Sequence, residues 1–153
     1  MADWIRGERS ATIAAPPATC FAVLADVEAY PEWQSMVGEI RVHDRDEHSR
    51  PQVVETVAIT QVRTVRYVMR YAFEPPRRIA WRQLEGDLRD LEGEYTFADG
   101  PQGGTHATYR LGILPGRRLG LLTRAPLFPQ VAGWFMHQAL DELRARCEAV
   151  GAR

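Results

Sequence analysis

The chain has 153 residues, of which 45% are hydrophobic and 25% charged, and its formal net charge at pH 7 is -1. These values are ordinary for a soluble globular protein, and dispersed arginines with a near-neutral charge argue against a nucleic-acid partner. A chain of this length can bury one sizeable core, so we expect residues 1–153 to form one domain. Cys20 and Cys147 are too few for a disulfide framework and are interpreted as small buried side chains of a reduced compartment.

Residues 10–25 are uncharged and rich in alanine, as in the apolar part of a signal peptide. Pro16 and Pro17 interrupt this segment, and the acidic Asp3 and Glu8 precede it, which is atypical of a secretory leader. No run approaches the ~20 apolar residues that a membrane-spanning helix needs. We therefore expect a cytoplasmic protein.

The first third of the chain predicts one strand and two short helices. Residues 5–14 alternate weakly between apolar and polar, as a strand does. The proline pair at residues 16–17 favours the start of a short helix, with Phe21 and Leu24 on its inner face. Pro31 suits the first turn of a second short helix.

Between residues 37 and 114 the apolar period changes to two, which is typical of strands. In the clearest example Tyr67, Met69 and Tyr71 share one face, and Arg66 and Arg70 share the other. Short turns link most of these segments, so we expect about seven strands in a largely antiparallel sheet. The predicted strands after the first lie near residues 37–42, 53–60, 65–73, 79–82, 91–97 and 107–113.

Residues 129–150 predict a long C-terminal helix, with Pro129 in its first turn and Gly151 at its stop. Its apolar side covers about half of the circumference, wider than the ~100° stripe that packs on a flat layer. A curved sheet that wraps around the helix would explain this width, and the fold class is α+β. The apolar side comprises Phe128, Val131, Ala132, Phe135, Met136, Ala139, Leu140, Leu143, Cys147 and Val150.

The order of these elements resembles the START-like SRPBCC superfamily, and within it the polyketide cyclase/dehydrase and coenzyme Q-binding START-like proteins. The resemblance implies a helix-grip fold: a seven-stranded curved antiparallel sheet wrapped around the last helix, with two short helices between strands one and two. It also implies a deep apolar cavity between sheet and helix. The scaffold hosts carriers, cyclases and chaperone-like binders, so the fold alone does not fix a function. The resemblance rests on residues 14–17 (AAPP), 23–33 (VLADVEAYPEW), 67–71 (YVMRY), 78–81 (RIAW), 93–97 (GEYTF), 118–122 (RLGLL) and 126–128 (PLF).

Aromatic and methionine side chains on the predicted inner faces are the main signal of a ligand site. Buried tyrosines are costly as pure core because each hydroxyl needs a partner, and ligand pockets are mostly apolar with a few polar groups. Simple core packing is the alternative for most of these positions. The candidate ligand-binding residues are Trp33, Met36, Tyr67, Met69, Tyr71, Trp81, Tyr95, Tyr109, Phe135 and Met136.

The motifs of metal, phosphate and serine-hydrolase chemistry are absent: there is no HExxH, CxxC, phosphate-binding loop or GxSxG. The four histidines lack metal-ligand spacing, so we expect no metal and no cofactor. Cyclases of this superfamily use an arginine and tyrosines in the cavity. Arg66 alternates with Tyr67 and should face solvent, Glu55 could face either way, and Tyr30 stands where many cyclases have tryptophan. No catalytic residue is assigned.

Charged side chains on the opposite strand faces predict an exposed ladder, in which Arg82 and Arg110 flank Glu92 and Glu94. Residues 117–128 combine leucines with arginines and could form a lid, a contact with a membrane or an apolar protein, or simple packing.

These observations predict binding or transport of a small apolar molecule, lipid-like or aromatic, of polyketide or isoprenoid type, in an internal cavity. Two alternatives stay open: an aromatase/cyclase that acts on a polyketide chain, and an apolar protein-interaction module. A binding protein is favoured over an enzyme, because a cyclase more often needs a buried acidic or basic group.

Overall fold

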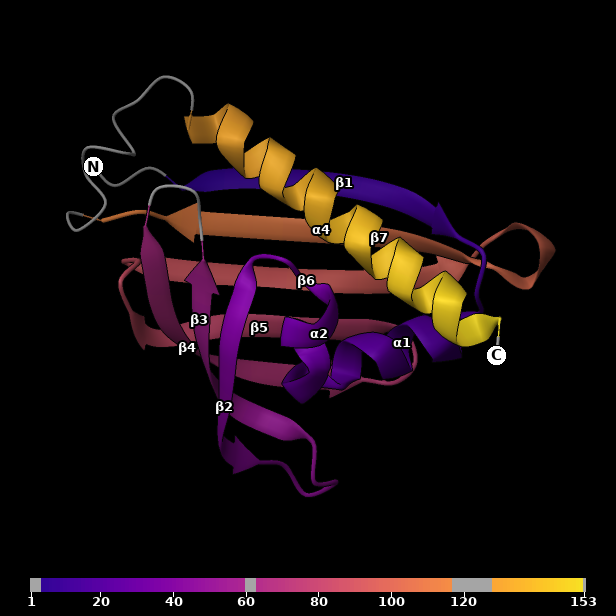
Figure 1. Ribbon diagram of the computed structural model, residues 1–153, viewed down its shortest axis with the longest axis horizontal. Helices are drawn as coiled ribbons and strands as arrows, with labels where there is room; N and C mark the ends of the chain where they lie inside the picture. Colours follow the sequence, from indigo (N-terminus) through magenta and orange to yellow (C-terminus); the bar gives the residue numbers. More distant parts are fainter. Residues whose placement is uncertain (1–3, 60–62, 117–127, 153) are drawn as a thin grey trace.

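A curved antiparallel sheet holds one long helix against its inner face in the computed structural model, which describes residues 4–59, 63–116 and 128–152 (Figure 1). The strand bounds agree with the predicted ones to within a few residues, because the period-two pattern marks them. The elements are β1 (Ile5–Ile13), α1 (Pro17–Ala25), the 3-10 turn η1 (Val27–Ala29), α2 (Tyr30–Trp33), β2 (Val37–Arg45), β3 (Pro51–Ile59), β4 (Thr64–Glu74), β5 (Arg78–Gly86), β6 (Asp90–Asp99), the 3-10 turn η2 (Pro101–Gly103), β7 (Thr105–Leu114) and α4 (Phe128–Gly151).

The seven strands of the described chain follow the order β1-β7-β6-β5-β4-β3-β2, and every neighbouring pair is antiparallel. Strands β2 to β6 each pair with the next strand in sequence, and β7 pairs with β1. The short helices carry the chain from β1 to the opposite edge of the sheet, where β2 begins. Figure 1 shows α4 lying diagonally over β1 and β7, with α1 and α2 beside it on the same side of the sheet. This arrangement confirms the predicted helix-grip fold.

The register identifies the inner face of the sheet. Gly7 on β1 lies against α4, since a Cβ atom there would come within 2.8 Å of Met136 Sδ. Period-two alternation along the strands extends the inner face in both directions from this row. Residues paired with Gly7 across successive strands share its face: Leu111, Gly93, Trp81 and Tyr71.

The buried side of α4 is narrower than predicted. Its fully buried side chains are Met136, Leu140, Leu143 and Cys147, and Phe135 and Ala139 flank them half-buried. Val150 was predicted on this side but is exposed, because Gly151 instead faces Ala15 at the C-terminal end of the helix. The side chains of Phe128 and Val131, and the predicted lid at residues 117–127, lie outside the described residues.

A polar contact holds the C-terminal end of α4, near two buried thiols. The Glu148 carboxylate accepts a hydrogen bond from the Ala14 amide at 2.9 Å, at the link between β1 and α1. Cys147 and Cys20 are both buried free thiols, as the sequence predicts. The Cys20 thiol lies 3.5 Å from the Thr105 hydroxyl. None of the described helices is long and apolar enough to cross a membrane.

Candidate ligand-binding site

Four aromatic rings meet on the inner face of the sheet. The Trp81 ring on β5 lies 6.1 Å from that of Tyr71, 5.8 Å from that of Tyr95 and 5.9 Å from that of Tyr109, measured between centroids. Tyr95 and Tyr109 come from directly paired positions on β6 and β7. The alternating pattern of four neighbouring strands therefore builds one aromatic wall.

A missing side chain makes room for this wall. Gly93 is the residue opposite Trp81 in the pairing of β5 with β6. A Cβ atom at Gly93 would lie only 2.5 Å from Cζ2 of Trp81. The indole ring therefore lies flat over the Gly93 backbone, and this contact sets its position among the three tyrosines.

The tyrosine hydroxyls on the inner face differ in their hydrogen bonding. Tyr30 on α2 donates to the Leu24 carbonyl at 2.5 Å. Within the described part of the chain, no hydrogen bond involves the hydroxyls of the other inner tyrosines. These inner tyrosines are Tyr67, Tyr71, Tyr95 and Tyr109.

Burial keeps these tyrosines neutral. Burial raises the pKa of Tyr67 to about 12. Burial, followed by the charges that Tyr67 and Tyr109 would carry if ionised, raises the pKa of Tyr71 further. The pKa values of Tyr95 and Tyr109 are likewise raised, chiefly by burial. At neutral pH each hydroxyl is therefore both a hydrogen-bond donor and an acceptor.

Two further inward polar side chains were missed by sequence reasoning. Thr56 on β3 lies opposite Tyr67, and Gln83 on β5 lies opposite Met69. The oxygen atoms Thr56 Oγ1 and Gln83 Oε1 are buried without a hydrogen-bond partner among the described residues. The signal was present, because both residues continue the alternation of inward positions on their strands.

A polar contact joins α4 to the start of β2. The Glu142 carboxylate accepts hydrogen bonds from the Ser35 amide at 2.8 Å and from the Ser35 hydroxyl at 3.1 Å. Gln138, one turn earlier on α4, donates to the same hydroxyl at 2.6 Å. We call these three residues the Ser35 latch, since they connect α4 to the segment between α2 and β2.

Most of the predicted ligand-binding residues come together. Met36 is the exception: it is only half-buried and does not join the hydrophobic cluster, because it lies at the start of β2, where its carbonyl accepts from the Ile59 amide. Trp33 packs at the edge, with its ring 5.5 Å from that of Tyr30. The residues that share one cluster are Trp33, Tyr67, Met69, Tyr71, Trp81, Tyr95, Tyr109, Phe135 and Met136.

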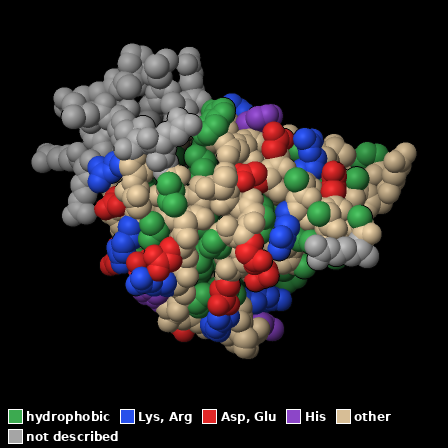
Figure 2. Space-filling model, viewed as in Figure 1, with side chains coloured by type: hydrophobic (Ala, Val, Ile, Leu, Met, Phe, Trp, Pro, Cys, Tyr) green, Lys and Arg blue, Asp and Glu red, His purple; other side chains and the backbone are tan. Residues whose placement is uncertain are grey.

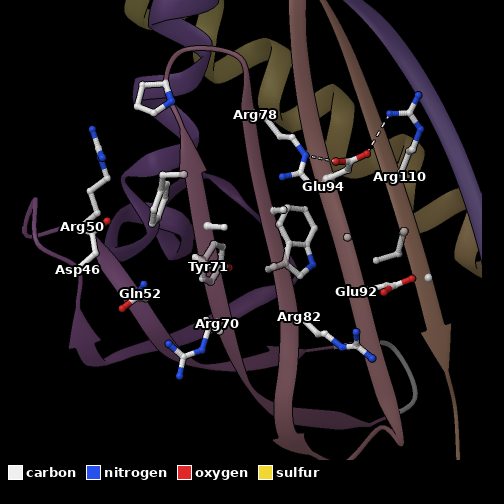
Figure 3. A pocket seen from close by; sticks show the side chains of 18 of the residues that line it. Asp46, Arg50, Gln52, Arg70, Tyr71, Arg78, Arg82, Glu92, Glu94 and Arg110 are labelled. Carbon is white, nitrogen blue, oxygen red and sulfur yellow. Dashed lines mark hydrogen bonds and ion pairs between the residues drawn. The ribbon is translucent and has the colours of Figure 1, made fainter.

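The outer face of the sheet is charged and hollowed. A hollow of about 1280 Å³ lies over the strands on the side away from α4 (Figure 3). Glu94 lines it and accepts from Arg78 at 2.5 Å and from Arg110 at 3.2 Å. Arg110 also binds Glu8 at 2.9 Å, and Arg78 also binds Glu74 at 2.5 Å. We call this five-residue series the outer ladder.

The predicted ladder is thus partly wrong in its partners. Arg110 does bind Glu94, but Arg82 pairs with Asp90 at 3.0 Å, and Glu92 pairs with Arg6 at 2.6 Å. Although Arg82 and Glu92 occupy paired backbone positions, Arg82 reaches its diagonal neighbour Asp90, and Glu92 reaches over Gly112 on β7 to Arg6 on β1. Long side chains select such diagonal partners, which alternation alone does not reveal.

Arg66 and Glu55, considered from the sequence as possible cavity residues, also lie on the outer face of the sheet. Glu55 accepts from Arg66 at 2.8 Å and lies 2.9 Å from His43 Nε2. Arg66 therefore faces solvent, as predicted, and Glu55 shares its side of the sheet. Within the described residues, no group of three His, Cys, Asp or Glu side chains could hold a metal ion. On the face that carries α4, acidic and basic side chains are interspersed (Figure 2).

Comparison with known proteins places the chain in a family. The family model described as polyketide cyclase/dehydrase and lipid transport matches residues 5–148. The chain belongs to this family. No curated protein matches it.

Solved structures support the fold of this polyketide cyclase/dehydrase family member. A START superfamily protein from Mycobacterium smegmatis has a TM-score of 0.81 at 18% identity, over 95% of this chain and 98% of that one. The Zhui aromatase/cyclase from a Streptomyces species has a TM-score of 0.81 at 18% identity, over 95% and 94%. A protein from Thermus thermophilus has a TM-score of 0.79 at 22% identity, over 97% and 99%. At these identities the likeness concerns the fold alone.

Proposed function

We propose that this family member binds a small apolar molecule, aromatic or isoprenoid, between the inner face of its sheet and α4. One observation carries the proposal: four tyrosines whose hydroxyls have no hydrogen-bond partner among the described residues lie on the inner face of the sheet, and the rings of three of them pack around Trp81. Ring faces provide stacking surface for a flat or branched apolar ligand, and a few hydroxyls orient it. The residues are Tyr67, Tyr71, Tyr95 and Tyr109.

The chemistry of these groups favours binding over catalysis. A general base or acid works best when its pKa lies near the operating pH. Burial moves the pKa of the inner tyrosines upward, away from neutrality, so they stay protonated. Neutral hydroxyls and amides hold and orient a ligand without exchanging protons with it. A carrier needs no more than this.

Calorimetric titration with 2-naphthol and with farnesol tests the proposal. We expect saturable binding of at least one compound, and a melting temperature that rises with its concentration. Tyr109→Phe should weaken binding by about two- to twelvefold, the value of one neutral hydrogen bond. Tyr30→Phe is the matched control, since its hydroxyl already binds Leu24. If neither compound binds or raises the melting temperature, the proposal is wrong.

Turnover distinguishes the aromatase/cyclase alternative. A positioned proton donor contributes about 10²–10⁴-fold to rate, far more than to affinity. The products of a linear poly-β-ketone should be compared with and without the protein. A selective rate loss of that size in Tyr109→Phe, with binding unchanged, would replace the carrier proposal with an enzyme.

A further inference from the structure

We propose that Gln83 and Thr56 form a polar subsite that selects ligands bearing a hydroxyl or N–H donor. The inference rests on the proposed function, because it concerns the same space between sheet and helix. It adds a requirement that aromatic packing alone does not impose: the ligand must donate a hydrogen bond.

Gln83 has one end of its amide fixed. It lies two residues after Trp81 on β5, and therefore on the same inner face. Its Nε2 donates to the Leu88 carbonyl in the following turn at 2.8 Å. This bond turns Oε1 away from Leu88, and that oxygen is buried without a partner among the described residues. An amide oxygen can only accept a hydrogen bond, so its partner must be a hydrogen-bond donor.

Thr56 supplies a second unpartnered oxygen on the same face of the sheet. Its side chain is only 2% exposed, and its hydroxyl is buried without a partner in the described part of the chain. It lies directly opposite Tyr67 on β4 and Ile40 on β2. Because a hydroxyl both donates and accepts, Thr56 can complete a hydrogen bond to whichever lone pair or proton the ligand presents.

The groups lie on three consecutive strands of the sheet. All three share the inner face: Thr56 on β3 is paired with Tyr67 on β4, and Gln83 on β5 is paired with Met69, two residues along β4 from Tyr67. The Tyr67 hydroxyl is protonated at neutral pH, since burial raises its pKa to about 12. A ligand hydroxyl can donate to Gln83 Oε1 and accept from Tyr67 or Thr56. A ketone or ether oxygen satisfies the two hydroxyls but leaves Gln83 unpartnered.

The ligand class follows from this matching of hydrogen-bond donors and acceptors. A buried acceptor left without a partner is penalised, so a site built around it discriminates against analogues that lack the donor. The rings around Trp81 favour an aromatic body. The subsite therefore fits a phenol or an enol better than the corresponding ether or a hydrocarbon.

A matched pair of probes tests the subsite by calorimetry: 2-naphthol and 2-methoxynaphthalene, which differ by one methyl group on the oxygen. We expect the wild-type protein to prefer 2-naphthol by roughly five- to a hundredfold. In Gln83→Leu the preference should fall to within about threefold, while 2-methoxynaphthalene binds as before or more tightly. Thr56→Val should reduce the preference by a smaller factor, because the Gln83 acceptor remains.

Matched control variants make the same chemical changes elsewhere. Gln52→Leu alters a glutamine that lines the outer hollow, and Thr12→Val alters an exposed threonine on β1. Both should keep the wild-type preference. Gln83→Met is a second variant of similar length, for use if Gln83→Leu does not melt cooperatively.

The outcomes separate this inference from the proposed function. Equal affinity of the wild-type protein for the two probes, or an unchanged preference in both Gln83 variants, overturns the subsite and leaves the carrier proposal standing. Failure of both probes and of farnesol to bind overturns the carrier proposal, and the subsite with it. A preference that collapses only when Gln83 is changed supports both.

Discussion

The rings of Tyr95 and Tyr109 stack with their centroids 4.4 Å apart and their planes inclined by 27°. The two residues are paired across β6 and β7, so the register of these strands fixes the stack. Burial raises the pKa of Tyr95 most, and the charge that Tyr109 would carry raises it further. The pair therefore carries two neutral hydroxyls on the inner face of the sheet.

Removing single hydroxyls should affect stability unequally. Tyr30→Phe deletes a buried hydrogen bond to the Leu24 carbonyl, so we expect a loss of about 1–2 kcal/mol in the free energy of unfolding. Tyr109→Phe deletes a hydroxyl with no partner among the described residues and should change stability by less than about 0.5 kcal/mol. Urea unfolding of both variants measures the difference. Equal losses would show that Tyr109 has a partner in the folded protein.

Stability should fall steeply in alkali. The folded-state pKa of Tyr67 is raised to about 12, above the ordinary value of 10, so the unfolded chain releases this proton first. The stabilising contribution is complete below pH 10 and is lost as the pH rises toward 12, by up to about 1.4 kcal/mol per pH unit for each such tyrosine. Urea midpoints between pH 8 and 12 measure the slope. Tyr67→Phe should make it shallower; an unchanged slope would contradict the assignment to Tyr67.

Glu94, at the centre of the outer ladder, should contribute more to the free energy of unfolding than a residue in a single surface ion pair. Burial alone would raise the pKa of Glu94, but the hydrogen bonds and charges of Arg78 and Arg110 bring it below the ordinary value. We expect Glu94→Gln to cost about 1 kcal/mol at pH 7. The matched control Glu92→Gln removes a single exposed pair with Arg6 and should cost less than about 0.5 kcal/mol.

The pH dependence of the Glu94 effect has a definite sign. Because the folded-state pKa is lowered, the contribution is present above the unfolded value of 4.5 and is lost as the pH falls through the folded value. The difference between wild type and Glu94→Gln should therefore be smaller at pH 3 than at pH 7, as measured by urea unfolding. A difference that persists at pH 3 would mean that packing, and not charge, is responsible.

The Ser35 latch should protect one amide from exchange with solvent. The Ser35 amide donates to the Glu142 carboxylate, and Glu142→Ala removes that acceptor. We expect hydrogen exchange at Ser35 to accelerate about tenfold or more. Asp141→Ala is the matched control, because Asp141 pairs only with Arg144 and His137 on its own helix among the described residues. Similar rates in the two variants would contradict the latch.

The sequence predicts the strands and their faces because alternation is a local property. Tyr67, Met69 and Tyr71 share a face by spacing alone, and the same rule places Arg66 outside. The apolar side of the last helix predicts that the sheet packs against it, although the buried side is narrower than the pattern suggests. Here the physical signal is strong, since a one-residue error would turn every side chain to the wrong face.

Partner choice depends on tertiary geometry, and the sequence does not reveal it. Arg82 reaches Asp90, because a long side chain on a twisted sheet selects among several neighbours. Thr56 and Gln83 lie on predicted inward positions, yet their missing partners emerge only when the surrounding side chains are in place. Val150 faces solvent because Gly151 takes the position against Ala15 at the end of the helix, which the helix's own sequence pattern does not show.

The contact between Trp81 and Gly93 has a consequence for how ligand size could diverge among relatives. The indole ring of Trp81 fills the space above Gly93, so a Cβ atom at residue 93 would overlap the ring. A methyl group gained at Gly93 therefore requires a smaller ring at position 81. The double substitution Trp81→Phe with Gly93→Ala would keep an aromatic ring at position 81 while moving the aromatic surface away from α4. Molecules with one more fused ring could then enter through a paired change, whereas Gly93→Ala alone would disturb all three tyrosines.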